Sequence, residues 1–284
     1  MKHIISRTIT VLGLLGSSMS ASAFTIDGNL SDWGVNPTTW MPFAGIEYTI
    51  EDQVGGGAFY LSPGWGGQAY DAEALYAKIQ DGQLYIALAT GHNPRTPNQP
   101  KANSYGAGDF AIDFGKNGSF DLGINILHVD RVTGNGTYQF ESFGVEAGVY
   151  QNPTWAYGLW DSNGQYTDPQ GTAYAPDLSH PTHLTGGTLV GMAQLAYTTS
   201  PVKGYGSNPN DDHYFYEMSI PLQLLRDSGW DGNPFDIHWT ENCANDSIFV
   251  DPPAEVSEPA TLGLIGLSLF GLFHGRKRKK AAAG

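Results

Sequence analysis

The chain has 284 residues, with 14 basic and 28 acidic side chains. Residues 24–257, which exclude the two terminal signals described below, keep 7 basic and 27 acidic residues, a formal net charge of −20. Such an acidic surface repels phosphate backbones, which excludes nucleic acid as a partner. The 37 glycines and 17 prolines disfavour long helices and favour short strands joined by tight turns.

The first 23 residues have the three parts of a secretory signal peptide. Lys2 and Arg7 form a basic start, residues 9–15 are mostly apolar, and the small residues end in Ala21-Ser22-Ala23. This order predicts export by the general secretion machinery and cleavage after Ala23, with Ala21 and Ala23 forming the cleavage site. The alternative is a buried first helix.

Residues 24–250 are predicted to form one β-domain. The clearest unit is a hairpin of residues 74–79 and 84–90, because Asp81-Gly82 accepts the positive φ angles of a type I′ turn. Further strands are predicted at 109–114, 123–129, 188–198, 214–220 and 235–240, the last as the closing strand, and one helical turn at 222–226, with Pro221 at its first position. Residues 91–108 and 151–183 are predicted as long loops, where binding function usually lies.

Several pieces of this body, in this order, resemble the family 9 carbohydrate-binding modules and DOMON-type sandwiches. They are the opening segment 24–33 (FTIDGNLSDW), the hairpin, the acidic strand 108–114, Glu217 with Ile220-Pro221-Leu222, and the aromatic strand 235–240. The resemblance implies an all-β fold, an antiparallel β-sandwich of the jelly-roll or DOMON-like kind with long loops.

Residues 113–121 are the best candidate for a metal site. Calcium prefers several oxygen ligands from a short loop, and Asp113, Asn117 and Asp121 supply them at suitable spacings. The alternative is a polar hairpin in which Asn117-Gly118 makes the turn. Family 9 modules commonly bind structural calcium, so the resemblance also implies this cofactor.

Exposed aromatic side chains beside amides and carboxylates have the chemistry that binds sugars. Trp65, Trp155 and Trp160 are the candidate residues, with Tyr70, Tyr157, Tyr166 and Tyr174 and several polar residues nearby in the loops. Each of these aromatic side chains has a core position as its alternative. We expect a polysaccharide as the ligand.

The sequence contains no motif for a catalytic residue. It has no G-x-S-x-G serine elbow, phosphate-binding glycine loop or dinucleotide fingerprint. His180, His183 and His213 are interpreted as surface-loop residues rather than zinc ligands, and the single cysteine, Cys243, as a small buried hydrophobe. An enzyme is therefore not expected.

Residues 257–280, after a spacer at 251–256, have three parts. Ser257-Glu258-Pro259 precedes an apolar run at 262–273 and a basic block at 276–280. The run is shorter than the roughly 20 residues of a stable spanning helix, so it predicts a short membrane helix that anchors the chain temporarily, with the basic block on the cytoplasmic side.

This end resembles the PEP-CTERM sorting signal of Gram-negative bacteria, with Ser257 at the place of the first motif proline. The resemblance implies processing by an exosortase and delivery to the cell surface or extracellular matrix. Residues 239–246, which end in Asn245-Asp246, also resemble the last strand of such exported proteins. A simple C-terminal tail anchor is the alternative.

The resulting expectation is an exported surface or matrix protein with a non-catalytic carbohydrate-binding body. Two alternatives remain, which are a structural envelope or biofilm protein without a specific ligand, and a secreted hydrolase. The hydrolase requires two carboxylates at catalytic spacing across a cleft, and a sequence does not reveal that spacing.

Overall fold

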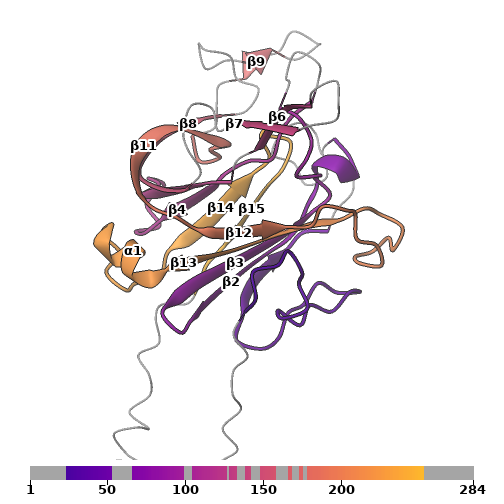
Figure 1. Ribbon diagram of the computed structural model, residues 1–284, viewed down its shortest axis with the longest axis horizontal. Helices are drawn as coiled ribbons and strands as arrows, with labels where there is room; N and C mark the ends of the chain where they lie inside the picture. The colour runs from indigo at the N-terminus through magenta and orange to yellow at the C-terminus, as the bar shows by residue number, and fades with distance from the viewer. Residues whose placement is uncertain are drawn as a thin grey trace, which may run out of the picture.

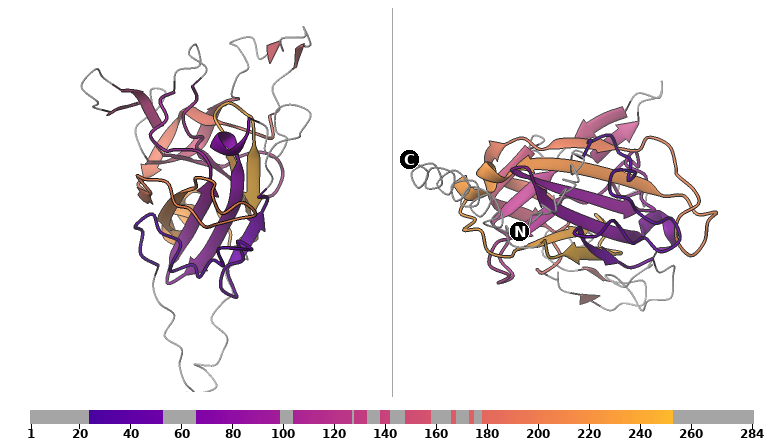
Figure 2. Two further views of the ribbon diagram at one scale, coloured as in Figure 1. Left: turned by 90° about the vertical axis from the view of Figure 1, so that its right-hand side faces the viewer. Right: turned by 90° about the horizontal axis from the view of Figure 1, so that it is seen from below.

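The computed structural model describes residues 24–52, 66–98, 104–126, 128–132, 138–141, 148–157, 166–167, 173–174 and 178–252. Two antiparallel sheets pack face to face, and the only helices in these residues are one short α-helix and one 3₁₀ turn (Figures 1 and 2). The predicted all-β sandwich is therefore confirmed.

The first sheet has five strands, in the order β1-β2-β3-β13-β12. Their bounds are Glu47–Ile50 for β1, Ala72–Gln80 for β2, Gln83–Thr90 for β3, Tyr214–Pro221 for β13 and Gln194–Tyr197 for β12. The 3₁₀ helix η1, Gln68–Tyr70, comes directly before β2.

The second sheet has six strands, in the order β11-β8-β5-β4-β14-β15. Their bounds are His183–Gly191 for β11, Gly148–Ala156 for β8, Leu122–Asn125 for β5, Phe110–Asp113 for β4, Asp236–Thr240 for β14 and Ser247–Val250 for β15. Two small ribbons pair β6 (His128–Val132) with β7 (Tyr138–Glu141) and β9 (Tyr166–Thr167) with β10 (Ala173–Tyr174).

The predicted hairpin is confirmed as β2 and β3. Its two turn residues, Asp81 and Gly82, have φ angles of 51° and 74°, as a type I′ turn requires. The predicted helical turn is α1, Leu222–Asp227, which buries Leu222 and Leu225 at one end of the sandwich. Pro221 is the N-cap of α1 and the last residue of β13.

The main core lies between the two sheets. The inward faces of β2, β3 and β13 bury residues such as Leu75, Ile86 and Met218 against Ile112, Ile124 and Trp239 of the other sheet. A second apolar cluster covers the outer face of the five-stranded sheet, where Leu30, Trp33 and Trp40 pack over Tyr76 and Phe215. The opening segment of the body is thus part of the packed structure.

Two predicted single strands are in fact pairs of strands. The predicted strand 123–129 is divided between β5 of the second sheet and β6 of a small ribbon. The predicted strand 188–198 is divided between β11 and β12, which belong to opposite sheets. The chain passes from one sheet to the other at residues 192–193, and a run of β-forming residues does not reveal such a crossing.

Other boundaries also differ from the prediction. Residues 151–156 belong to β8 although they were predicted as part of a loop, and β1 was not predicted at all. Residues 235–240 do not close the sheet, because β15 follows β14 and forms the edge. Residues 241–246 are therefore the turn of the last hairpin rather than the end of a strand.

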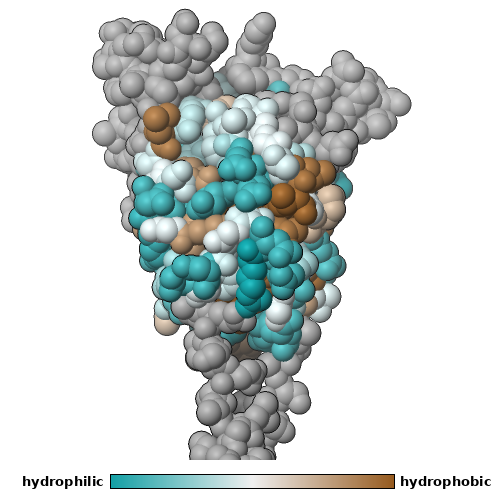
Figure 3. Space-filling view, turned by 90° about the vertical axis from the view of Figure 1, so that its left-hand side faces the viewer, coloured by the Kyte–Doolittle hydropathy of each residue, from teal (hydrophilic) through white to brown (hydrophobic). Residues whose placement is uncertain are grey.

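The face that carries α1 is mostly hydrophilic, with apolar surface in small separate areas (Figure 3). Cys243 is buried, as predicted, and its thiol is free. Within the described residues, no helix has the length and apolar character needed to cross a membrane. The predicted signal peptide (1–23), the sorting signal (257–280) and most of the spacer (251–256) lie outside these residues.

Candidate functional site

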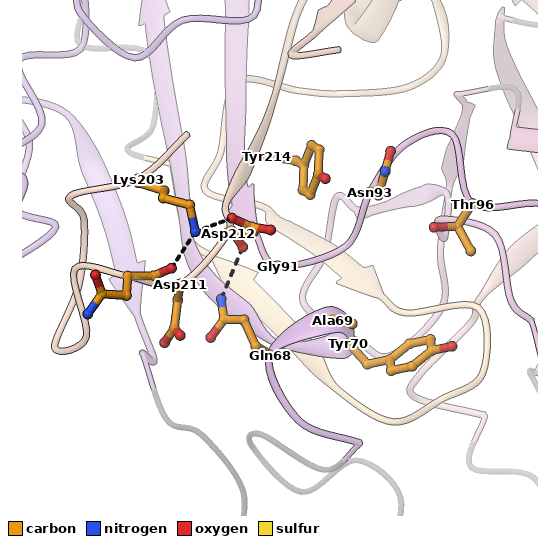
Figure 4. A pocket seen from close by; sticks show the side chains of 11 residues that line it. Gln68, Ala69, Tyr70, Gly91, Asn93, Thr96, Lys203, Asp211, Asp212 and Tyr214 are labelled. Carbon is orange, nitrogen blue, oxygen red and sulfur yellow. Dashed lines mark hydrogen bonds and ion pairs between the residues drawn. The ribbon is translucent and has the colours of Figure 1, made fainter. Parts of the chain in front are cut away.

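A cleft of about 400 Å³ opens at one end of the five-stranded sheet. Three segments surround it, namely η1, the loop that follows β3 and the segment that leads into β13 (Figure 4). Its lining residues are Gln68, Ala69, Tyr70, Gly91, Asn93, Thr96, Lys203, Asn210, Asp211, Asp212 and Tyr214. The cleft therefore uses part of the 91–108 loop that was predicted to carry binding function.

The lining combines two phenol rings with many hydrogen-bonding groups. Tyr214, Asn93 and Thr96 lie on one side, and Lys203 and Asp212 lie on the other (Figure 4). Amides, hydroxyls and carboxylates between them offer both donors and acceptors. A ligand with many hydroxyl groups and an apolar ring face is complementary to such a surface.

Gly91 makes the close approach of two of these segments possible. Its N–H donates to the carbonyl of Asp71 at 2.9 Å, directly after η1. A Cβ at Gly91 would lie 1.5 Å from the carbonyl oxygen of Gln68, where no side chain fits. Glycine at this position therefore lets the loop cross η1 and form the cleft.

The opposite rim is fixed by Lys203. Its ammonium group pairs with Asp212 at 2.6 Å and donates to the carbonyl of Asn210 at 2.6 Å. Asp211 in turn accepts a hydrogen bond from the amide of Asn208 at 2.7 Å. The two adjacent carboxylates of this rim are therefore held in position by neighbouring groups.

Beneath the cleft, Gln68 connects the lining to a buried histidine–carboxylate pair. Its Nε2 donates to Oε1 of Glu73 at 2.5 Å, and Nδ1 of His213 lies 3.0 Å from the same oxygen. Burial raises the pKa of Glu73, and the hydrogen bonds from His213 and Gln68 partly oppose this. The edge of Trp40 packs against the His213 ring, with centroids 5.1 Å apart.

A second buried histidine lies on the other side of η1. Nε2 of His92 donates to the carbonyl of Tyr105 at 2.9 Å and lies 3.5 Å from Glu241. Burial lowers the pKa of His92 to about 4 and raises the pKa of Glu241 well above its ordinary value. In both groups burial disfavours the charged form.

The interpretation of the histidines as surface-loop residues was wrong for two of them. His213 is buried against Glu73, and His183 is buried with its Nδ1 2.6 Å from Oδ1 of Asn242. His180 is partly exposed. No signal in the sequence separates a buried histidine in a polar network from a solvated one.

The predicted calcium residues lie together in the β4–β5 turn, where they bind backbone groups. Asp113 accepts the N–H groups of Gly115 and Gly118 at 3.0 and 2.6 Å. Asp121 accepts the N–H of Phe114 at 2.7 Å, and Asn117 accepts that of Ser119. These contacts are those of a polar hairpin turn. Calcium at this turn remains a prediction.

Trp155 lies away from the cleft, on β8 of the other sheet. It belongs to a row of rings that runs across Phe120, His238 and Phe249, with centroids 6.1, 5.2 and 5.6 Å apart in that order. Trp155 is half-buried, and Phe249 is 52 % exposed. Trp65 and Trp160, the other two candidates, lie outside the described residues, as do Ala21, Ala23, Ser257, Glu258 and Pro259.

Within the described residues, no group of three or more His, Cys, Asp or Glu side chains is already arranged as a metal site.

The sequence did not single out Asn93, Thr96, Asp211 or Asp212, which line the cleft. The available signal was the Pro-, Gly- and Asn-rich composition of the 91–108 loop. The 203–214 segment has the same composition, but we made no prediction for it.

Comparison with known proteins assigns the C-terminal end of the chain. Residues 255–279 match the family model of the PEP-CTERM protein-sorting motif. This motif supports export and surface sorting in Gram-negative bacteria and implies processing by an exosortase. No curated protein matches the chain. The likeness of the body to family 9 modules and DOMON-type sandwiches stays a resemblance. The structure confirms one part of it, the sandwich architecture.

Proposed function

We propose that the body of this exosortase-sorted surface protein binds a neutral polysaccharide in the cleft and does not cleave it. One observation carries the proposal, namely the combination of Tyr70 and Tyr214 with amide, hydroxyl and carboxylate groups around a space of about 400 Å³. Sugar rings offer apolar faces to aromatic side chains and hydroxyls to polar groups, so both kinds of contact are available to one ligand.

Charge supports a neutral ligand. The body carries a formal net charge of −20, and Asp211 and Asp212 stand at the rim of the cleft. An acidic polymer would be repelled by this field at low ionic strength, whereas a neutral glycan would not. Lys203, the cation of the lining, is already paired with Asp212.

The arrangement of the carboxylates supports binding without hydrolysis. Glycoside hydrolysis requires two carboxyl groups that flank the scissile bond, one as acid and the other as base or nucleophile. The carboxylates that line this cleft, Asp211 and Asp212, are neighbours on one segment, and Asp212 is held by Lys203. The opposite side has Asn93 and Thr96, which do not supply an acid.

Binding is tested by affinity electrophoresis of the exported protein through gels that contain β-glucan, xylan or galactomannan. We expect retardation by at least one of these polymers, and an affinity reduced about tenfold or more in Tyr70→Ala and Asn93→Ala. Tyr48→Ala is the matched control, because Tyr48 is an exposed tyrosine of β1 that does not line the cleft.

The outcomes separate the three functions. Free migration of the wild type in every gel would reject the binding proposal and leave the structural envelope protein. Release of reducing sugar ends from a retained polymer would show a hydrolase instead. Retention that Tyr70→Ala and Asn93→Ala leave unchanged would place the binding surface elsewhere, and the row of rings around Trp155 is then the next surface to test.

A further inference from the structure

Asp71 has an unusual environment for a carboxylate. It follows η1 directly, its residue is 0 % exposed, and within the described residues no donor reaches either of its carboxylate oxygens. Its backbone carbonyl is used fully, because it accepts from the N–H of Gly91 and the hydroxyl of Thr90. A buried carboxylate without donors is costly, so its charge requires a partner.

Glu73 and Asp246 are the nearest carboxylates to the side chain of Asp71, and Glu73 is already paired with His213. Asp246 comes from the β14–β15 turn and accepts the N–H groups of Ala72 and Ser247, each at 2.8 Å. These two bonds fix Asp246 against the start of β2. Two carboxylates that touch in a buried place cannot both be ionised unless a cation or a shared proton lies between them.

Glu51 is the third carboxylate of this group. Its N–H donates to the carbonyl of Glu73 at 2.8 Å, which holds the chain just after β1 beside β2, and its Oε2 is buried without a donor among the described residues. Glu51 and Asp246 lie close enough to interact electrostatically, as do Glu51 and Asp71. The pKa of Glu51 is raised to about 8 and that of Asp71 to about 9, in both cases chiefly because the side chain is buried.

We propose that Asp71, Asp246 and Glu51 bind one calcium ion, which joins the two sheets beside the floor of the cleft. The three side chains offer oxygen atoms alone, which calcium prefers to nitrogen or sulfur ligands. Among the described residues no three such side chains are already arranged as a metal site, so binding of the ion requires the side chains of this group to move toward one another. Calcium accepts such flexible geometry more readily than magnesium does.

The position of the ion has a structural consequence. Asp71 is one residue from Tyr70, which lines the cleft, and its carbonyl holds Gly91. Asp246 belongs to the second sheet, through the turn between β14 and β15. An ion bound by both residues therefore stabilises the junction of the two sheets, and it does so whether or not the cleft binds a sugar.

The test is thermal unfolding of the exported protein in EDTA and then with added CaCl₂ or MgCl₂ at pH 8. A ligand that binds the folded state raises the melting temperature, by about 5–10 °C at a hundredfold excess over Kd for a chain of this size. We expect this shift with calcium, a much smaller shift with magnesium, and no calcium shift in Asp71→Asn and Glu51→Gln.

Two comparisons distinguish a bound ion from a merely structural carboxylate. In EDTA at pH 8, Asp71→Asn should melt at nearly the same temperature as the wild type, because asparagine replaces a carboxyl group that is mostly uncharged when no ion is bound. Asp113→Asn, in the β4–β5 turn, is the matched control and should keep the calcium shift. Sensitised luminescence of bound terbium, lost in Asp71→Asn, gives a readout that does not depend on stability.

Three results would overturn the proposal. The first is a calcium shift that Asp113→Asn abolishes and Asp71→Asn retains, since the ion would then lie in the β4–β5 turn. The second is a wild-type melting temperature that calcium does not change but that falls as the pH rises past 9, since Asp71 and Asp246 would then share a proton. The third is a shift with zinc in place of calcium.

Discussion

The indole Nε1 of Trp33 donates to Oε1 of Glu217 across 2.7 Å, in a buried site. The other carboxylate oxygen, Oε2, accepts the N–H groups of Asp27, Gly28 and Asn29 at 3.1, 2.6 and 2.9 Å. One side chain in the centre of β13 thus binds four donors of the opening segment. The Ile-Asp-Gly…Asp-Trp pattern of the opening segment is therefore the part of the chain that Glu217 holds against the sheet.

Removal of this carboxylate should destabilise the body strongly. In Glu217→Ala, four donors lose their acceptor, including the buried Trp33 indole, so we expect a loss of about 3 kcal/mol or more in the free energy of unfolding. Trp33→Phe removes one donor and a smaller volume, and should cost about 1–2 kcal/mol. Urea denaturation followed by tryptophan fluorescence and circular dichroism measures both values.

Glu47→Ala is the matched control for this experiment, because Glu47 is an exposed glutamate at the start of β1. Its substitution should change the free energy of unfolding by less than about 0.5 kcal/mol. If Glu217→Ala were as stable as Glu47→Ala, the opening segment would not depend on Glu217 for its attachment.

Gly91→Ala should disturb the cleft through the backbone. The added Cβ would lie 1.5 Å from the carbonyl oxygen of Gln68, so η1 and the loop after β3 have to separate. We expect a loss of about 1–3 kcal/mol in stability and a loss of polysaccharide retention in affinity electrophoresis. Gly67→Ala, a substitution in the same region that meets no atom within 4 Å but has a φ of 76°, controls for backbone strain alone.

Asp109 should give the protein a specific dependence on pH. Burial raises its pKa to about 7, although the N–H groups of Leu184 and Ile126 donate to its carboxylate. Because an unfolded aspartate titrates near 4, the folded state holds this proton more tightly. The contribution of Asp109 to stability is therefore complete below about pH 4 and is lost as the pH rises to about 7.

The comparison of the wild type with Asp109→Asn isolates this contribution. His92 and His238, whose pKa values are lowered to about 4 mainly by burial, give an opposite slope between about pH 4 and 6.5, but both are present in both proteins. We expect the free energy of unfolding of the wild type, taken relative to that of Asp109→Asn, to fall as the pH rises from 4 to 7, as measured by urea denaturation of both proteins at several pH values. Equal slopes would contradict a raised pKa at Asp109.

Local signals in the sequence predicted the parts of the fold that depend on adjacent residues. Asp81 and Gly82 predicted the β2–β3 turn because few residues other than glycine, asparagine and aspartate accept positive φ angles. Pro221 and the residues after it predicted α1, because proline is favoured at the first position of a helix. The strand runs of β4, β13 and β14 were recognisable from their own composition.

The partners of each strand were not predictable in the same way. β13 pairs with β3, and β14 pairs with β4, across more than a hundred residues of chain. The division of residues 188–198 between two sheets depends on such contacts too. The same limit applies to the site, since Asp71 and Asp246 are far apart in the sequence and lie together only in the folded sandwich. The spacing of residues along the chain reveals only metal ligands that come from one loop. For this reason it pointed to Asp113, Asn117 and Asp121.

The last prediction concerns the row of rings on the second sheet. Gly123 of β5 lies beneath Trp155, and a Cβ at this position would be 2.9 Å from the indole ring and 2.6 Å from a methyl group of Leu184. Both neighbours are side chains that have to move to admit a methyl group. Gly123→Ala should therefore destabilise the body by about 1–3 kcal/mol through overpacking.

A double-mutant cycle identifies the residue responsible for this cost. Trp155→Leu shortens the side chain that meets the new methyl group, so Gly123→Ala should cost at least about 1 kcal/mol less in that background than in the wild type. Urea denaturation of the four proteins gives the coupling energy. A coupling energy near zero would mean that Leu184 alone resists the added methyl group. The Trp155 ring would then be free to move on the sheet, as it would have to be in order to bind a ligand.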